Sequence, residues 1–448
     1  MSDIAAALQA IMHRATGITA PAENLVRLSG GANMESSSFD YGGQGFVLRR
    51  APSAAFMEGR AFGHDVEAAL VRAAHAGGVL APEVVAELAE SDGIGTGYIM
   101  RRIYAEVNPA KILAAPPPSL ITDIARELAA IHAIAPRADI AIPHMDTAAA
   151  LTDLKARFMT YGGDRPIIAL ALRWCEDHQP PPATSVLVHG DFRMGNLMVS
   201  TGGLAGVLDW ELAHWGDAHE DLAYGCMAVW RFGHFERPAF GVADLDSYFA
   251  AYEAASGTCV DRDRFRFWLI YRTLWWAIGC LQMAEIWRSG VDRSLERPVI
   301  GRRTSENEID LLMLLEEDAP EAERGTISLP SPAPARRMGE PSATELLEAL
   351  REWIESDVKA KAQGRDRFMA AVAMNAIGIL IRDAENPANP HDAALSADLL
   401  AGRQSLATHG LLRQLRTIAL AKLANDSPKY ASLGAARALW LESDHFPR

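Results

Sequence analysis

The sequence predicts an α+β fold with two lobes, followed by a small all-α domain. Short strand-like runs separated by glycine-rich turns dominate residues 1–103, whereas residues 104–318 show mainly helical periodicity. Residues 319–341 are rich in proline, serine and charge, which is the composition of a linker. Residues 342–448 again show only helical patterns, so we expect an accessory helical domain there.

The composition is that of a soluble globular protein, with 49% apolar and 22% charged residues. The net charge of −14 argues against a nucleic-acid partner, because proteins that bind polyanions present a basic surface. The four cysteines form no C-x-x-C pair, so we expect a reduced, cytoplasmic chain. Residues 1–14 lack the apolar core of a secretory signal, and charges interrupt the hydrophobic stretch 265–287, so we expect no membrane span.

The N-terminal lobe begins with an amphipathic helix at 4–15. A glycine-containing loop at 28–33 then leads into two strands at 35–39 and 46–49, joined by the turn Tyr41–Gly45. Arg50 is expected on the opposite strand face from Arg49, in contact with solvent. A helix at 62–76 and strands at 84–88 and 97–100 complete this lobe.

The larger lobe is predicted to be mostly helical. The helix at 119–133 carries four apolar residues at helical spacing, and His132 at its end is expected to have a structural role. Further helices are expected at 148–159, at 167–178, from about His219, and within 226–288. Five tryptophans of the last region are expected mainly in the core: Trp230, Trp268, Trp275, Trp276 and Trp287.

The stretch 186–221 contains the strongest indication of chemistry. A short strand at 186–188 leads to Asp191, and a hairpin with its turn at Gly202–Gly203 follows. This register places Asn196 opposite Asp209, about 5 Å away and beside Asp191. The hard oxygen atoms of these three side chains suit Mg²⁺.

Aspartate and asparagine also end strands and start turns, so each of these residues alone is most simply a turn residue. The convergence of three favours a functional site. The order of an Asp, an Asn after four intervening residues, and a second Asp after the next strand matches the pattern of phosphoryl transfer. In that pattern the first Asp accepts a hydroxyl proton and the other two residues hold metal.

The motifs His189-Gly190-Asp191 with Asn196, and Leu208-Asp209-Trp210-Glu211, resemble those of the aminoglycoside phosphotransferase and choline kinase superfamily. The resemblance covers roughly residues 5–310 and implies a protein-kinase-like fold. No A-P-E segment follows, unlike in protein kinases. Residues 216–224 are similar to the branch whose members are fused to acyl-CoA dehydrogenases in animals.

The resemblance implies roles for individual residues. Asp191 would be the catalytic residue, and Asn196 and Asp209 would bind Mg²⁺. The loop containing Gly30 and Gly31 would cover the phosphates of ATP. Arg49 would contact the α and β phosphates, with its planar guanidinium in place of the usual lysine. Glu67 would be the partner of Arg49, although a solvated helix glutamate is the simpler interpretation of that residue.

The resemblance also places the adenine against backbone atoms near Met100 and Arg102. This sequence has M-R-R-I there, where relatives often have an acidic residue, so the choice between ATP and GTP stays open. Asp221 is expected to hold the catalytic loop through backbone N–H groups. Asp217 is expected to cap a helix first of all, with substrate contact as the alternative.

These features together predict an ATP- and Mg²⁺-dependent phosphotransferase that acts on a hydroxyl of a small molecule. The fused relatives suggest a hydroxyacyl-CoA, with amino alcohols and aminoglycosides as alternatives. An aminoglycoside needs an acidic wall, but the acidic residues of 226–262 alternate with arginines: Glu236, Asp244, Asp246 and Glu253, with Arg231, Arg237 and Arg262. A nucleotide-sensing pseudo-kinase acting through its helical domain is a further alternative, which the intact Asp191, Asn196 and Asp209 disfavour.

The C-terminal domain is predicted to start at a capping box formed by Ser342 and Glu345. Helices follow at 346–354, 368–382, 392–401 and 411–424. The domain resembles a small uncharacterised helical domain found beside bacterial phosphotransferases. It contains no chemical motif, so we expect a docking role or a homodimer contact.

Overall fold

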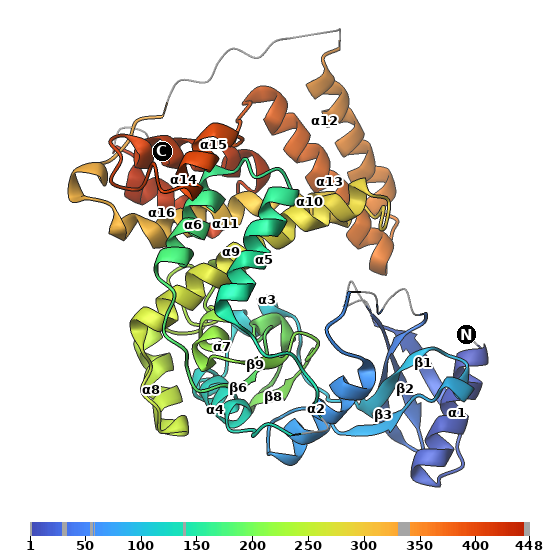
Figure 1. The fold of residues 1–448 in the computed structure, drawn as a ribbon. Coiled ribbons are helices and arrows are strands. Elements are labelled where there is room, and N and C mark those ends of the chain that lie inside the picture. The colour runs from blue at the N-terminus through green and yellow to red at the C-terminus, as the bar shows by residue number, and fades with distance from the viewer. Residues whose placement is uncertain are drawn as a thin grey trace.

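A computed structural model describes residues 2–28, 34–53, 57, 59–137, 140–329 and 341–442. A five-stranded sheet with its flanking helices forms the smaller lobe, and helices make up most of the remainder (Figure 1). The predicted α+β architecture, a strand-rich lobe followed by helical regions, is confirmed.

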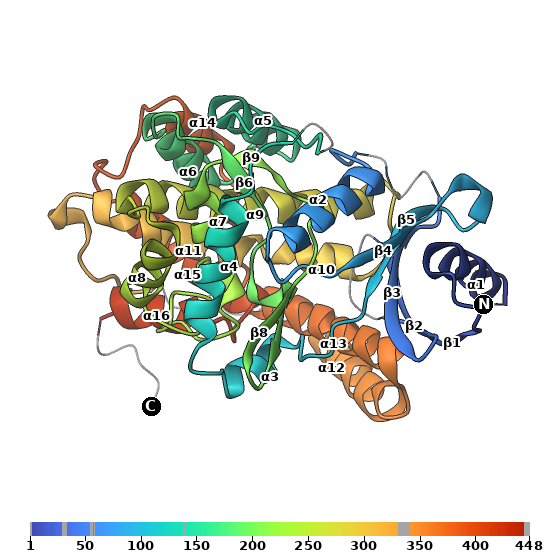
Figure 2. The same ribbon diagram turned by 90° about the horizontal axis from the view of Figure 1, so that it is seen from below.

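The sheet of the smaller lobe is antiparallel and has the strand order β1-β2-β3-β5-β4. Helices α1 and α2 cover opposite sides of this sheet (Figure 2). The strand β1 was not predicted, because its residues are polar and mostly exposed. The elements are α1 (Ser2–Thr16), β1 (Ala22–Arg27), β2 (Glu35–Tyr41), β3 (Gln44–Ala51), α2 (His64–Ala76), β4 (Val84–Glu87) and β5 (Thr96–Arg101).

Successive side chains of β3 point to opposite faces of the sheet, and the two faces have different surroundings. Phe46 and Leu48 are buried in a core with Leu8 and Ile11 of α1, so Arg49 projects from the other face, towards the larger lobe. The prediction that Arg50 is solvated is wrong. Its guanidinium donates to the carbonyl of Ile94 at 2.8 Å and to Glu35 at 2.7 Å, and its side chain is only 13% exposed.

The larger lobe contains two small antiparallel ribbons among its helices. Strand β6 (Val186–Val188) pairs with β9 (His214–Gly216), and β7 (Leu197–Ser200) pairs with β8 (Gly203–Val207). The helices of this lobe are α3 (Pro109–Ala114), α4 (Leu120–His132), α5 (Thr147–Thr160), α6 (Pro166–Asp177), α7 (Ala218–Tyr224), α8 (Leu245–Ser256), α9 (Arg262–Arg288), α10 (Glu296–Arg302) and α11 (Thr304–Leu315). The predicted helices are present among them, and α3, α10 and α11 are additional helices that were not predicted.

The register of the β7–β8 hairpin differs from the prediction. Ser200 pairs with Gly203, so the turn lies one residue earlier, at 201–202. Gly203 lies directly against the side chain of Asp123 in α4, a position that leaves no room for a Cβ atom. A bulge after Leu204 then shifts the pairing, and Asn196 lies opposite Leu208, whose N–H donates to the Asn196 carbonyl at 2.9 Å. The predicted pairing of Asn196 with Asp209 is therefore wrong by one residue.

The long helix α9 crosses the interior of the larger lobe. Trp230 and Trp268 are buried as predicted, whereas Trp275, Trp276 and Trp287 on α9 are half-buried. Among the described residues, no helix combines the length and the apolar character needed to cross a membrane.

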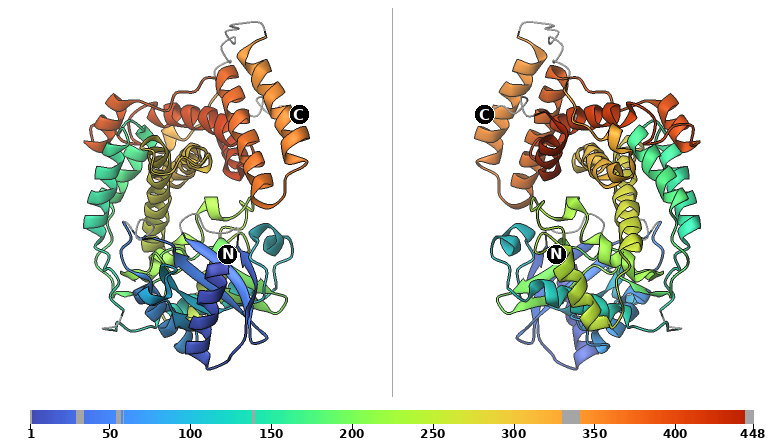
Figure 3. Two further views of the ribbon diagram at one scale, coloured as in Figure 1. Left: turned by 90° about the vertical axis from the view of Figure 1, so that its right-hand side faces the viewer. Right: turned by 90° about the vertical axis from the view of Figure 1, so that its left-hand side faces the viewer.

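The C-terminal region is helical, as predicted, and starts at the predicted capping box, in which Ser342 and Glu345 cap each other's backbone. Helix α16 was not predicted, although Leu433, Ala436 and Trp440 are buried on it at helical spacing. Figures 1 and 3 show this region at one end of the molecule and the sheet at the other. The elements are α12 (Ala343–Trp353) with a π-helical extension (Ile354–Lys359), α13 (Gly364–Glu385), α14 (Ala393–Leu400), α15 (Leu411–Asp426) and α16 (Ala431–Trp440).

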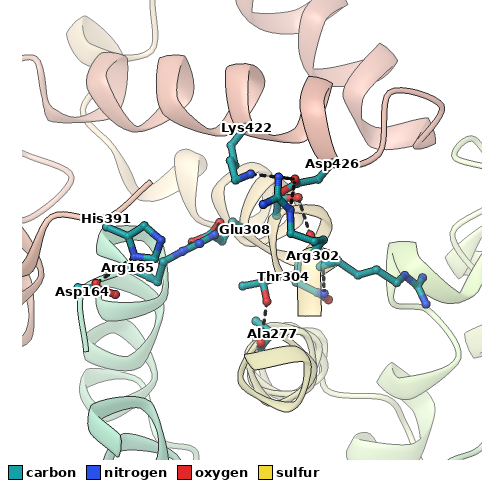
Figure 4. Close-up of polar contacts among 12 residues, drawn as sticks. Asp164, Arg165, Ala277, Arg302, Thr304, Glu308, His391, Lys422 and Asp426 are labelled. Atoms are coloured by element: carbon teal, nitrogen blue, oxygen red, sulfur yellow. Dashed lines mark hydrogen bonds and ion pairs between the residues drawn. The ribbon is translucent and has the colours of Figure 1, made fainter. Parts of the chain in front are cut away.

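Helices α14, α15 and α16 share their hydrophobic core with the larger lobe, since α14 packs on α6 while α15 and α16 pack on α11. Polar contacts connect the same parts: the Asp392 N–H donates to the Asp164 carbonyl at 2.7 Å. Arg302 also contacts Asp426 at 2.6 Å (Figure 4). The start of the predicted linker is also packed, because Ile327 is buried and bridges to Leu441. The C-terminal helices therefore extend the larger lobe instead of standing apart from it.

Candidate active site

The loop between β6 and β7 has a shape that depends on glycine. Gly190 has a φ of +80°, and a Cβ atom there would collide with the carbonyl of Leu212. The neighbouring His189 is fully buried, and its Nε2 lies 3.1 Å from the Leu208 carbonyl. The same ring accepts the Asp191 N–H through Nδ1 at 3.2 Å. His189 thus connects the Asp191 loop to the end of β8.

Asp221 holds this loop, as predicted. Its two carboxylate oxygens accept the N–H groups of His189 at 2.6 Å and Gly190 at 2.9 Å. Burial opposes the charged form of Asp221, but hydrogen bonds and the charge of His132 outweigh burial and lower its pKa. His132, whose Nε2 lies 3.3 Å from Asp221 and whose Nδ1 lies 2.8 Å from the Tyr252 hydroxyl, has the predicted structural role.

Helix α9 provides a second support for the loop. Arg272 is buried, donates to the Gly190 carbonyl at 3.4 Å and forms an ion pair with Glu220 of α7. Glu220 also lies 3.0 Å from Nε2 of His214. The loop is therefore fixed from two helices before any ligand binds.

Asp191 lies at the tip of the loop, where side chains of its neighbours contact the carboxylate. Arg193 Nε donates to its Oδ1 at 2.8 Å, and Asn196 Nδ2 donates to its Oδ2 at 2.5 Å. Arg193 also lies over the ring of Trp230, 4.4 Å from the ring centre. Burial and then the negative charge of Asp191 raise the pKa of Tyr224 well above its ordinary value. The carboxylate of Asp191 is thus held in place by a cation and an amide.

Arg49 is the centre of the second part of the site. Its Nε lies 3.0 Å from Glu67 of α2, while Nη2 lies 2.8 Å from Asp209 and 2.6 Å from Glu211. Arg60 also contacts Glu211, at 2.8 Å. One guanidinium therefore connects the sheet and helix α2 of the smaller lobe to the segment that follows β8.

The electrostatics of this cluster depend on burial. Burial opposes the charge of Arg49, but Glu67 and then Asp209 outweigh it and raise the arginine pKa. Burial also raises the pKa of Glu67, against the effect of Arg49. The pKa of His64 is lowered to about 4 by burial, with the charges of Arg49 and Arg60 adding to that effect. His64 is therefore neutral at pH 7.

Asp209 has a φ of +69°, the left-handed region that residues other than glycine rarely adopt. Strained backbone of this kind is concentrated at functional sites. The His189 ring and the Leu208–Asn196 hydrogen bond hold the two segments side by side. Asn196 and Asp209 thus belong to adjoining segments, although not to one cross-strand pair.

The residues present fit a magnesium ion bound with a nucleotide. Asp209 and Glu211 converge on one cationic nitrogen, Nη2 of Arg49, so their oxygen atoms already meet at a position that attracts positive charge. Among the described residues, no three or more His, Cys, Asp or Glu side chains are grouped for a metal. Mg²⁺ needs no such cage, because one or two carboxylates and the phosphates of a substrate usually hold it.

Other predicted binding residues are less defined. Gly30 and Gly31 lie outside the described residues. Met100 is part of β5, opposite Val47. The Arg102 N–H donates to the Gly45 carbonyl at 3.0 Å, and its side chain contacts Asp40 and Tyr104. The amide of Arg102 is therefore already occupied within the smaller lobe.

Sequence reasoning gave no role to Arg193 or Glu211. Each lies two residues after a predicted site residue, Arg193 after Asp191 and Glu211 after Asp209. The chain is extended at Arg193, and an extended chain returns to the same side every second residue, so this spacing was an available signal for Arg193. The left-handed backbone of Asp209 removes that signal for Glu211.

The surroundings of Asp191 are aromatic and cationic. Trp230 lies 5.5 Å from Trp276 between ring centres, and the indole N–H of each is buried with no hydrogen-bond partner within the described residues. Three of the four acidic residues considered for an aminoglycoside wall have other contacts: Asp244 caps α8, Asp246 pairs with Arg262, and Glu253 accepts the N–H of Val260.

Asp217 is the cap of α7, as predicted, and also accepts from Trp268 at 2.9 Å and Arg264 at 2.5 Å. Burial alone would raise its pKa, but the hydrogen bonds from His219, Arg264 and Trp268 lower it. These contacts satisfy the carboxylate within the protein, and the alternative of substrate contact stays a prediction.

Comparison with known proteins identifies the family of the chain and supports its fold. A model of the phosphotransferase enzyme family matches residues 24–268, more than half of the chain. A segment of 98 residues is 32% identical to acyl-CoA dehydrogenase family member 10 of Mus musculus, and one of 47 residues is 51% identical to "Probable acyl-CoA dehydrogenase IBR3" of Arabidopsis thaliana. The segments span 19% and 10% of this chain and 9% and 6% of those relatives.

The solved structure of a "putative aminoglycoside phosphotransferase" from Ralstonia eutropha JMP134 superposes with a TM-score of 0.55. The identity is 23%, and the match covers 70% of this chain and 98% of the other. At this identity the likeness concerns the fold alone, and it confirms the predicted two-lobed, kinase-like architecture.

Proposed function

The chain belongs to the phosphotransferase enzyme family, and we propose that it transfers the γ-phosphoryl group of ATP to a hydroxyl group of a small molecule in the cytoplasm. The observation that carries this proposal is the convergence of Glu67, Asp209 and Glu211 on Arg49. It joins the smaller lobe to the loop segment beside Asp191, and nucleotide phosphates bind between such elements in kinases.

Asp191 is the group that orients the acceptor hydroxyl and takes its proton. Its carboxylate is fixed by Asn196 and Arg193, which supports a positioned base, because geometry comes first in general base catalysis. Arg193 is close enough to the same centre to stabilise negative charge on the transferred group. Positioning and electrostatics, with little covalent chemistry, supply most of the rate in this type of reaction.

Arg49 turns from the carboxylates to the phosphates when the nucleotide binds, while Glu67 keeps its Nε in place. Asn196, Asp209 and Glu211 are the residues that would hold Mg²⁺, which when bound supplies neutralisation of phosphate charge. Backbone groups near Met100 would contact the base, and the segment containing Gly30 and Gly31 would cover the phosphates.

The acceptor we favour is a hydroxyacyl-CoA. Arg193 and the unpartnered indole N–H groups of Trp230 and Trp276 suit an acceptor that carries apolar and anionic parts. Three of the four acidic residues considered for an aminoglycoside, Asp244, Asp246 and Glu253, have partners in helix α8 and its surroundings. Amino alcohols and aminoglycosides serve as comparison acceptors.

A homodimer through residues 342–448 stays a prediction. Leu346 and Leu350 on α12 are exposed apolar side chains that such a contact would cover.

Thermal unfolding in the presence of nucleotides tests whether the chain binds ATP, as the proposal requires. Ligand at 100 times its Kd adds about 2.7 kcal/mol of stability, so Mg·ATP should raise the melting temperature by roughly 5 °C. GTP measured in parallel decides base selectivity. If neither nucleotide shifts the transition, the proposed nucleotide site is wrong and a pseudo-kinase function is also excluded.

A phosphate-transfer assay tests whether the chain transfers phosphate to the proposed acceptor. The chain is incubated with Mg·ATP and a 3- or 4-hydroxyacyl-CoA, an amino alcohol or an aminoglycoside, and ADP release is compared with the matched acyl-CoA that lacks the hydroxyl. Acceptor-dependent ADP release with only the hydroxyacyl-CoA supports the proposal. Nucleotide binding without transfer to any acceptor favours the pseudo-kinase.

A further inference from the structure

A polar cavity lies in the C-terminal helical region, far along the chain from the Asp191 loop. It has a volume of about 510 Å³ and lies between α12, α13 and the segment that connects α15 to α16. Its cationic side chains come from three different elements: Arg351 of α12, Arg382 of α13, and Lys429 before α16. This volume is within the range of about 300–1,000 Å³ that small-molecule sites occupy.

These three cations have no carboxylate partner among the described residues. Arg382 Nε donates to the Asn425 carbonyl at 2.7 Å, and its Nη2 is buried without a hydrogen-bond partner in the described part of the chain. A buried donor that lacks a partner loses the hydrogen bonds it would make to water, which is unfavourable. A ligand that places a hydrogen-bond acceptor in the cavity would therefore be favoured.

The carboxylates nearby already have other partners. Glu306 lines the same cavity, but Arg303 contacts it at 3.0 Å and the Ser427 hydroxyl donates to it at 2.7 Å. Asp426 is held by Arg302 at 2.6 Å and by Lys422 at 2.8 Å (Figure 4). The cavity thus has an excess of positive charge in a chain whose net charge is −14.

The electrostatics agree with this geometry. Burial lowers the pKa of Arg382, and the like charges of Arg351 and Arg302 lower it further, against the opposing effects of Asp426 and Asp383. A guanidinium whose pKa is lowered in this way is stabilised by an anion that brings negative charge close to it.

We propose that this cavity binds a small molecule through a phosphate or pyrophosphate group, at a site separate from the proposed catalytic centre. Two planar guanidinium groups and one ammonium group, approaching from three sides, match the several oxygens of a phosphate group better than the two oxygens of a carboxylate. The side chain of Asn375 also lines the cavity and offers an amide to the ligand.

Binding would also fix helix α12. No residue of α12 is buried, and Leu346 is 58% exposed, so this helix is held mainly by its contact with α13. An anion between Arg351 and Lys429 would connect α12 to the segment that precedes α16. Amide exchange in 343–359 should therefore slow down when the ligand is present.

Calorimetric titration of the full chain with sodium pyrophosphate, and separately with inorganic phosphate, tests the proposal. EDTA is present, so that metal-dependent binding at the nucleotide site does not contribute. We expect binding that weakens with added salt, and a Kd at least 10-fold higher in the double variant Arg351→Gln/Lys429→Gln, whose two side chains are exposed and tolerate substitution. Arg403→Gln is the matched control, because Arg403 lies in the same region but pairs with Asp398.

Two further measurements separate this site from the catalytic centre. Asp209→Asn should leave pyrophosphate affinity unchanged within 2-fold, and hydrogen exchange should show protection in 343–359. Equal affinity in the parent chain and the double variant overturns the proposal. A change of affinity of more than 2-fold in Asp209→Asn, in either direction, or protection confined to 34–53 and 186–211, also overturns it, because the anion then binds at the catalytic centre.

Discussion

Replacement of Arg49 by methionine tests the most buried part of the proposed site. Arg49 is 12% exposed and its partner Glu67 is 2% exposed, so the substitution leaves a carboxylate inside the protein with the Tyr98 hydroxyl, 3.1 Å away, as its main partner. Removing one member of a buried ion pair lowers the free energy of unfolding by about 3–5 kcal/mol. We expect a loss of this size at pH 8.

The loss should depend on pH in a defined direction. Without Arg49, the pKa of Glu67, already raised by burial, rises further, and the folded variant takes up a proton that the unfolded chain does not hold. Stability then falls as pH rises through this range, by up to about 1.4 kcal/mol per pH unit. The deficit of Arg49→Met relative to the parent should therefore shrink between pH 8 and pH 6.

Urea unfolding followed by circular dichroism provides the measurement, because residues 1–103 contain no tryptophan and fluorescence would report only the remainder of the chain. The double variant Arg49→Met/Glu67→Gln is the control, and it should recover most of the lost stability and show no added pH dependence. A deficit below about 1 kcal/mol, or one that is the same at pH 6 and pH 8, would refute the view that Glu67 is a buried anion neutralised by Arg49.

Three further substitutions address other contacts. Asp209→Asn should keep the fold but reduce turnover by about 10³-fold or more; near-normal ADP release would contradict the metal-binding role. Asp221→Asn leaves one carbonyl oxygen for two N–H donors, so we expect a loss of about 2–3 kcal/mol in urea unfolding and a lower kcat at unchanged acceptor KM. Burial raises the pKa of Asp310 to about 7, with hydrogen bonds from Ser432 and Tyr430 opposing, so this group lowers stability as pH rises from about 4 to 7. Asp310→Asn should therefore be more stable than the parent at pH 8, by up to about 4 kcal/mol, and nearly equal to it at pH 4.

Local patterns predicted most of the secondary structure, because apolar period and turn residues determine it directly. The errors in register and in burial occurred where contacts distant in sequence decide the outcome. Gly203 entered β8 because α4 packs against it, which a count of turn residues cannot detect. Alternation correctly placed Arg50 on the face opposite Arg49, but helix α1 and Ile94 cover that face.

The candidate site was predictable to a similar extent. The spacing of Asp191, Asn196 and Asp209 indicated adjoining segments, and these segments do adjoin even though the predicted register is wrong by one residue. The pairing of Arg49 with Glu67 came from the family resemblance, because nothing in the spacing of a strand arginine and a helix glutamate fixes their distance. Arg193 and Glu211 acquire their importance only from the partners that the fold brings to them.

The shared core of the larger lobe and the C-terminal helices limits where this chain can be divided. A truncation after residue 329 would remove Leu395 and Leu399, which are buried with helix α6, and Leu412 and Leu415, which are buried with α11. The remaining fragment would expose a large apolar surface, a common cause of aggregation. The Asp191 loop and the C-terminal helices therefore have to be produced and folded as one unit, even though the recognised motifs end more than 200 residues before the last helix.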